Sequence, residues 1–190
     1  MVTDGLPKTA RLRAEYVRSD ETPGLELPGD DRFLRAARGI EDALVTEEAA
    51  PVRTACVEFL RLAAEYYEVS MPQVRVLRAR PIRVREGGCG TELFGDYHFD
   101  EKLIRVWMRT AIQKRVTSFG TFFATLCHEF CHHLDRERFG FMETPHTRGF
   151  YERTAALYHH ARSTPAKRLC WVPFPGGRWR IDWPRTNRGE

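Results

Sequence analysis

The hydrophobic positions in the first half of the chain predict two amphipathic helices followed by short strands. Between residues 31 and 44, apolar side chains recur every three or four positions, as they do on one face of a helix. The same spacing continues through residues 51–69, where Pro51 suits the first helical turn. Segments in which apolar and polar residues alternate predict strands. These segments are residues 74–79, 82–86, 91–99 and 102–108.

The second half of the chain contains a long apolar helix, predicted from about Ser118 to Arg138. Thr117 or Ser118 can cap its first turn, because a hydroxyl there can accept a hydrogen bond from a free backbone N–H. Gly140 is suited to end the helix, since glycine adopts the left-handed conformation that is common at helix ends. The predicted helix therefore has a start signal and a stop signal.

Two further elements follow this helix. Thr144 is a plausible N-cap and Pro145 is favoured at a first helical position, which predicts a helix over residues 144–161. His146 would then lie in the opening turn of that helix. Residues 170–184 contain a Pro-Gly-Gly turn between two aromatic-rich segments, which predicts a hairpin.

The order of these elements is typical of an α+β domain, with helices, then a small antiparallel sheet, then two helices. A chain of 190 residues is long enough for one such domain, which we place at residues 30–162. Residues 1–29 mix charged residues, glycine and proline without periodicity, so a flexible N-terminal arm is expected. Residues 163–190 are a basic, aromatic C-terminal extension that we expect to pack on the domain.

Composition and charge narrow the class of protein. The formal net charge of +4 is mild and does not by itself indicate a nucleic-acid partner. No apolar run approaches the roughly 20 residues of a membrane helix, and residues 1–21 lack the apolar core of a secretory signal. We therefore expect a cytoplasmic protein without membrane contact. The five cysteines lack the spacing of a disulfide framework, so thiols are expected.

Three of the seven histidines lie in the segment TLCHEFCHHLD of the long helix. His128 and His132 are four residues apart, so both imidazoles can reach one metal ion from the same helix face. Glu129 is rotated about 100° from His128, so it can act as a base beside the ion rather than bind it. Zn²⁺ suits imidazole ligands and lowers the pKa of bound water to about 7. The motif therefore predicts hydrolysis of a peptide or protein substrate, with Glu129 passing the water proton to the leaving amine.

A catalytic zinc usually has three protein ligands and one open position. His146, fourteen residues after His132, is the preferred candidate for the third ligand, because a loop can return the next helix toward the metal. Asp135 lies on nearly the same helix face as His132 but further along. It fits an acceptor that orients an imidazole, or an ion pair with Arg136 or Arg138.

The segments CHEFCHHLD and ETPHTRGFYERTAALYHH resemble the SprT-like zinc metallopeptidases of the zincin group. In that family, HExxH on one helix is completed by a histidine that opens the next helix. The resemblance covers about residues 106–160 and implies a zincin-like fold, in which residues 92–108 provide an edge strand for an extended substrate. The implied zinc ligands are His128, His132 and His146, and the implied base is Glu129. The family commonly has glycine directly after the third histidine, whereas two residues precede Gly149 here.

Two alternatives to a peptidase remain open, together with a nucleic-acid contact of the C-terminal extension. A deformylase-like amidase would use Cys89 of the EGGCG turn as its third ligand in place of His146. A regulatory or binding module would use the same metal only to brace its fold. Residues 162–190 carry seven Lys and Arg against two acidic residues, together with three tryptophans, so this part could contact nucleic acid weakly through phosphates and bases.

Overall fold

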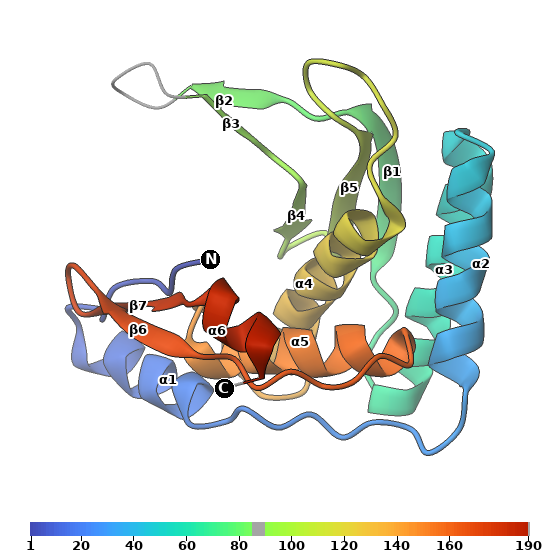
Figure 1. Ribbon diagram of the computed structural model, residues 1–190. Helices are drawn as coiled ribbons and strands as arrows, with labels where there is room; N and C mark the ends of the chain where they lie inside the picture. The colour runs from blue at the N-terminus through green and yellow to red at the C-terminus, as the bar shows by residue number, and fades with distance from the viewer. Residues whose placement is uncertain (85–89, 190) are drawn as a thin grey trace.

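The computed structural model describes residues 1–84 and 90–189, and it confirms an α+β protein (Figure 1). The helices are α1 (Ala10–Asp20), α2 (Arg32–Val45), α3 (Ala49–Tyr67), α4 (Phe119–Glu137), α5 (Arg148–Ala161) and α6 (Trp183–Arg188). The strands are β1 (Gln73–Ala79), β2 (Ile82–Val84), β3 (Gly90–Glu92), β4 (Gly95–His98), β5 (Leu103–Arg109), β6 (Trp171–Phe174) and β7 (Arg178–Ile181). The predicted helices over residues 31–44, 51–69 and 118–138 are confirmed to within a few residues.

Helices α2 and α3 lie side by side and bury the apolar faces that the sequence predicts (Figure 1). Phe33 and Ile40 of α2 are fully buried, as are Phe59 and Leu60 of α3. Helix α3 packs against β1, and the ring of Phe59 meets that of Phe123 in α4 edge-to-face at 5.0 Å between centroids. The hydrophobic core therefore reaches from the α2–α3 pair to the helix that carries HExxH.

The main sheet is mixed, with strand order β1-β5-β4, so the prediction of an antiparallel sheet is wrong. Strand β4 pairs with β5 in antiparallel fashion, but β1 pairs with β5 in parallel. The reason is the antiparallel pairing of β2 with β3. This pairing reverses the direction of the chain once. The turn between β4 and β5 reverses it again, so β5 runs in the same direction as β1. Strand β4 is consequently an edge strand, and it lies against α4.

Helix α4 passes through the middle of the molecule, in contact with α5, β4 and β5 (Figure 1). Ser118 caps it as predicted, because its hydroxyl accepts a hydrogen bond from the backbone N–H of Thr121 at 3.3 Å. Gly140, with φ of +66°, follows the end of the helix. Most side chains between residues 122 and 135 are buried, including polar ones. The helix is therefore positioned on all sides by the rest of the fold.

Helix α5 begins later than predicted, because Thr147 and not Thr144 caps it. The Thr147 hydroxyl accepts a hydrogen bond from the backbone N–H of Phe150 at 3.0 Å. Thr144 precedes a proline, which disfavours the helical conformation, and its φ is +39°. His146 accordingly lies in the loop directly before α5 and not in the opening turn of the helix.

Within the segment for which the sequence predicts a flexible arm, residues 10–20 form α1 and bury Tyr16 and Ser19. This helix packs on α5 at Gly149, where an added Cβ would lie only 2.1 Å from the carbonyl oxygen of Ser19. The contact is made by backbone and polar groups rather than by an apolar stripe. The hydrophobic pattern of the sequence therefore carries no sign of it.

The two ends of the chain pair with each other. Strands β6 and β7 form the predicted hairpin. Residues 1–4 run beside β7, where Val2 forms an antiparallel bridge with Arg180 and the backbone N–H of Thr3 donates to the carbonyl of Trp179 at 2.8 Å. The start of the chain is thus fastened to the C-terminal extension.

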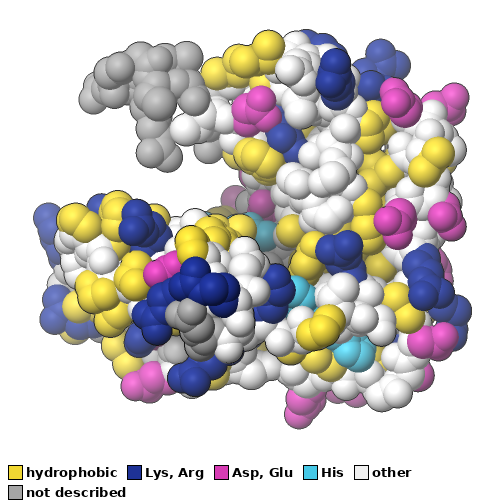
Figure 2. Space-filling model, in the orientation of Figure 1, with side chains coloured by type: hydrophobic (Ala, Val, Ile, Leu, Met, Phe, Trp, Pro, Cys, Tyr) yellow, Lys and Arg dark blue, Asp and Glu magenta, His cyan; other side chains and the backbone are white. Residues whose placement is uncertain are grey.

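One face of the molecule is hollowed, between the strands at the top of Figure 2 and the β6–β7 hairpin at the lower left, with a histidine at the base of the hollow. Strand β4 and α4, the helix with the HExxH motif, lie at the inner end of this hollow. In the described ranges of the chain, no helix is both long enough and apolar enough to cross a membrane.

Candidate metal centre

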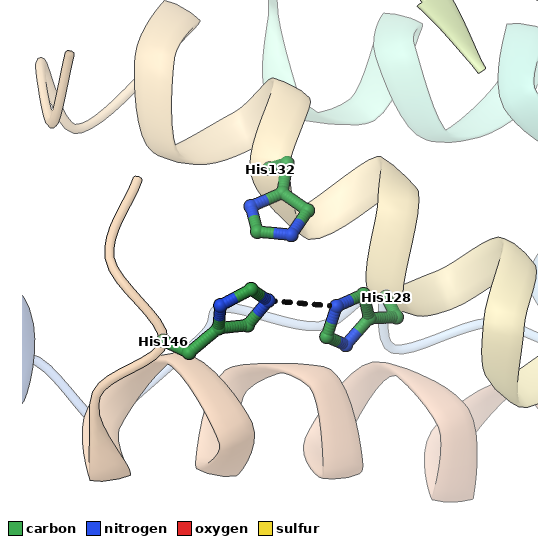
Figure 3. A group of neighbouring side chains, drawn as sticks. All are labelled: His128, His132 and His146. Atoms are coloured by element: carbon green, nitrogen blue, oxygen red, sulfur yellow. Dashed lines mark hydrogen bonds between the residues drawn. The ribbon is translucent and has the colours of Figure 1, made fainter. Parts of the chain in front are cut away.

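Three histidine rings converge at the junction of α4 and α5. His128 and His132 lie one turn apart on α4, and His146 faces them from the loop before α5 (Figure 3). One ring nitrogen from each lies within 4.8 Å of the others, and the Nε2 atoms of His128 and His146 are 3.1 Å apart. Tetrahedral zinc with bonds of about 2.0–2.1 Å separates its ligand nitrogens by about 3.3 Å. The structure therefore brings the three predicted ligands together at a spacing that suits a metal ion.

Two of these rings contact a protein oxygen through their outer nitrogen. His132 Nδ1 lies 2.7 Å from the hydroxyl oxygen of Thr144, and His146 Nδ1 lies 3.3 Å from Oδ2 of Asp4. A contact of this kind fixes the ring orientation and its tautomer, so that the other nitrogen stays available to a metal. Thr144, which was expected to cap a helix, thus holds an imidazole instead.

Burial keeps the two helix-borne imidazoles neutral. Loss of solvent around His128, with a smaller contribution from nearby His146, lowers its pKa from 6.5 to about 3. Burial likewise lowers the pKa of His132 well below its ordinary value. Metals bind the neutral imidazole. Both residues are therefore already in the ligand form at neutral pH.

These depressed pKa values predict that the metal-free protein loses stability as the pH falls below about 6.5. In the unfolded chain His128 and His132 take up protons near that pH, whereas in the folded chain they stay neutral. The unfolded state then binds more protons, so the free energy of unfolding falls by up to about 1.4 kcal/mol per pH unit for each histidine. Urea unfolding of metal-free protein between pH 7.5 and 5 measures this slope. His128→Gln should reduce this slope, and equal slopes in His128→Gln and the wild type would contradict the prediction.

Glu129 lies under the edge strand β4, with 6% of its surface exposed. Gly95 of β4 permits this close approach, because an added Cβ would lie 2.9 Å from Glu129 Oε1. Burial, together with the nearby carboxylate of Asp96, raises the pKa of Glu129 to about 8. A divalent cation nearby would favour the ionised form. Glu129 is therefore placed to take up and release a proton near neutral pH, as a general acid–base must.

A pocket of about 320 Å³ connects the three histidines with Glu129 and the edge strand β4. Its lining includes the acidic residues Asp4, Asp96 and Glu143. The carboxylate of Asp96 is bound by the guanidinium of Arg105 through two hydrogen bonds of 2.6 and 2.7 Å. The histidine cluster consequently lies in a pocket beside a strand edge.

Asp135 has neither of the roles predicted for it, which were to orient an imidazole or to pair with Arg136 or Arg138. It forms a buried ion pair with Arg153 of α5, whose Nη2 lies 2.8 and 3.0 Å from its two carboxylate oxygens. Arg153 also donates to the backbone carbonyl of Ser19 in α1 at 3.0 Å. The helix turns Asp135 away from the histidine cluster, toward the place where α1, α4 and α5 meet.

Three cysteines and one further histidine have side chains of a metal-binding type. Cys89, the alternative third ligand, lies outside the residues that the structure describes. Cys127 and Cys131 are buried in the core as thiols. His133 points away from the cluster, since its Nδ1 accepts a hydrogen bond from the hydroxyl of Tyr97 at 2.8 Å and its Nε2 donates to a backbone carbonyl.

The basic C-terminal extension uses aromatic residues for packing. The indole N–H of Trp171 donates to Glu152 at 3.1 Å, and the guanidinium of Arg148 lies 4.8 Å from the ring centroid of Trp179. Lys and Arg side chains gather on the surface of this region, in the lower left of Figure 2. The contact with nucleic acid stays a prediction.

Comparisons with protein-family models, with curated proteins and with solved structures find no match for this chain. The SprT-like resemblance therefore remains a prediction that depends on its motifs.

Asp4 and Thr144, which contact the outer nitrogens of two of the rings, are absent from the residues that the sequence predicts for this site. The contact of Asp4 with His146 joins residues 142 positions apart, and no local pattern marks it. Thr144 did carry a signal, because a threonine before Pro145 predicts a hydrogen-bonding hydroxyl. Sequence alone assigns that hydroxyl to the commoner partner, a helix N-terminus.

Proposed function

We propose that this protein is a zinc-dependent metallopeptidase. The observation that supports this most directly is the convergence of His128, His132 and His146 in the pocket that also contains the buried Glu129. Structural zinc sites are commonly closed by four protein ligands, whereas three imidazoles leave one position open. An open position next to a buried carboxyl is the arrangement that hydrolysis requires.

The donor set fits zinc. Magnesium and calcium prefer oxygen ligands, whereas neutral imidazole suits zinc and its neighbours among the transition metals. His128, His132 and His146 would hold the ion through ring nitrogens. When bound, zinc polarises a carbonyl group and lowers the pKa of water.

Glu129 would perform the proton transfers. Its carboxylate would accept the proton of the attacking water and deliver it to the leaving amine. Its burial makes it a stronger proton acceptor than an exposed glutamate, in keeping with a pKa raised to about 8. Strand β4, which passes over Glu129 at Gly95, offers the edge along which an extended peptide would lie.

We also propose the finer assignment, a zincin-like arrangement related to the SprT-like peptidases. It is supported by the order of the parts, which is an edge strand, then the HExxH helix, then a histidine directly before the next helix. Two residues separate His146 from Gly149 in this chain, and the first of them, Thr147, caps helix α5.

Removal of metal is expected to abolish hydrolysis, and added Zn²⁺ is expected to restore it. We would treat the protein with a chelator, measure zinc content by elemental analysis, and follow cleavage of an unstructured fluorescent polypeptide. His128→Gln should lose both zinc and activity. His133→Gln changes a histidine of the same helix whose ring points away from the cluster, so this variant should retain one zinc per chain. Hydrolysis that persists without metal would refute the proposal.

The alternatives predict different results in the same assay. A metal-braced binding or regulatory module would bind zinc and cleave nothing. A deformylase-like amidase would lose zinc on substitution of Cys89 and retain it in His146→Gln. The position of His146 beside the other two rings favours His146 as the third ligand.

A further inference from the structure

We infer that Asp4 is a positioning residue for the third ligand, His146, and that the two ends of the chain together form the brace that holds it there. These ends are residues 1–4 and strand β7. The inference deepens the proposed function, since it rests on the metal centre. It gives the N-terminal segment and the C-terminal extension a shared role in building that centre.

Asp4 holds His146 at three points. Its carboxylate Oδ2 accepts a hydrogen bond from the backbone N–H of His146 at 2.8 Å and lies 3.3 Å from the ring Nδ1. Its own backbone N–H donates to the carbonyl of His146 at 2.9 Å. One residue therefore restrains the main chain of His146 on both sides and the direction of its ring.

His146 needs such a restraint more than the other two ligands do. His128 and His132 sit on α4, where the helix sets their separation and the core sets their orientation. His146 is in a loop, and ligands on loops are held less accurately than those on helices. A carboxylate at Nδ1 favours the tautomer with a proton there, which leaves Nε2 bare and more basic toward a metal. Nε2 is the atom that faces His128.

Asp4 is in turn held by contacts on two sides. The hydroxyl of Tyr16 in α1 donates to the carbonyl oxygen of Asp4 at 3.1 Å. Thr3 is 2% exposed, and its hydroxyl oxygen accepts from the backbone N–H of Trp179 in β7 at 2.9 Å. Its backbone N–H donates to the carbonyl of the same tryptophan at 2.8 Å. The carboxylate is thus anchored through α1 and β7.

The C-terminal hairpin takes part in this arrangement through its pairing with the start of the chain. The hairpin supplies the strand on which residues 1–4 pair, and those residues end at His146. A purely structural role for Asp4 would stabilise the folded protein and leave metal affinity unchanged. If Asp4 positions His146, its replacement weakens metal binding by more than any loss of stability of the metal-free protein accounts for.

The test compares zinc affinity in variants of the full chain. Asp4→Asn keeps the shape and an acceptor oxygen but removes the charge, and Asp4→Ala removes both. Loss of a partner that orients a metal-bound histidine typically weakens metal binding by about 10–100-fold. We expect about tenfold for Asp4→Asn and more for Asp4→Ala, measured by competition with a chromogenic chelator. Asp42→Asn, which removes one exposed carboxylate on α2, should bind zinc like the wild type.

Urea unfolding of each metal-free variant, and the visible spectrum of the cobalt-substituted protein, separate positioning from folding. A changed cobalt spectrum in Asp4→Asn, with an unchanged unfolding midpoint, supports the inference. Tyr16→Phe leaves the carboxylate intact and should weaken zinc binding less than Asp4→Asn does. Zinc affinities within twofold of wild type in both Asp4 variants would overturn the inference, as would a wild type that binds no zinc. A wild type that binds zinc but hydrolyses no peptide would refute the proposed function and leave the role of Asp4 standing.

Discussion

Replacement of Glu129 by glutamine is expected to abolish hydrolysis while zinc remains bound. Glutamine has nearly the shape of glutamate, so it can occupy the buried position beneath Gly95. It cannot accept the proton of an attacking water. General acid–base groups contribute about 10²–10⁴ in rate, so kcat/KM should fall by that factor. The three imidazoles that we propose as zinc ligands are unchanged, so one zinc per chain should be retained.

The control for this variant is Glu137→Gln, two turns further along α4. That carboxylate pairs with Lys102 at 2.9 Å, and it is not among the residues that line the pocket of the histidine cluster. It should retain both zinc and activity. If Glu129→Gln keeps activity within tenfold of the wild type, Glu129 is not the base. If it loses zinc as well, its role is in the metal centre rather than in proton transfer.

Replacement of Arg153 by methionine is expected to cost about 3–5 kcal/mol of the free energy of unfolding. Arg153 is 1% exposed and its partner Asp135 is fully buried, so the variant would leave a carboxylate in the core without its cation. The same change removes the hydrogen bonds from Arg153 to Ser19 in α1. Urea unfolding of the metal-free proteins measures the loss.

The effect should be specific to a buried pair. The double variant Asp135→Leu with Arg153→Met removes both charges and should recover part of the lost stability, because neither group is then buried alone. Arg61→Met breaks exposed pairs with Glu58 and Glu65 on the surface of α3 and should change stability little. A loss in Arg153→Met no larger than that in Arg61→Met would contradict the prediction.

Local pattern was sufficient for helices α2, α3 and α4 and for the placement of His128 and His132 on α4. The apolar stripes of α2 and α3 are periodic, and Ser118 and Gly140 mark the start and end of α4, so these elements could be predicted within a few residues. The spacing of His128 and His132 determines that both face one direction, since four residues make about one helical turn. A helix brings its own residues together without help from the rest of the chain.

Contacts between distant segments were beyond the reach of the sequence. Helix α1 was missed because it docks through Gly149 and polar groups rather than through an apolar face. The direction of β1 depends on how many times the chain reverses before β5, which no local pattern records. The partner of Asp135 is an arginine eighteen residues away on another helix, and nearer arginines offered equally good chemistry.

The sequence by itself determined the α+β class of fold, the helix that carries the HExxH motif, and the residue types that this motif places on the helix. Those properties follow from periodicity and residue type, which act over one or two helical turns. Only the tertiary structure decided that His146 completes the cluster from a loop, that Thr144 and Asp4 hold the rings, and that the chain ends meet beside them. These contacts join segments that lie 142 and even 176 residues apart, and such closure depends on the packing of the whole chain rather than on any stretch of it.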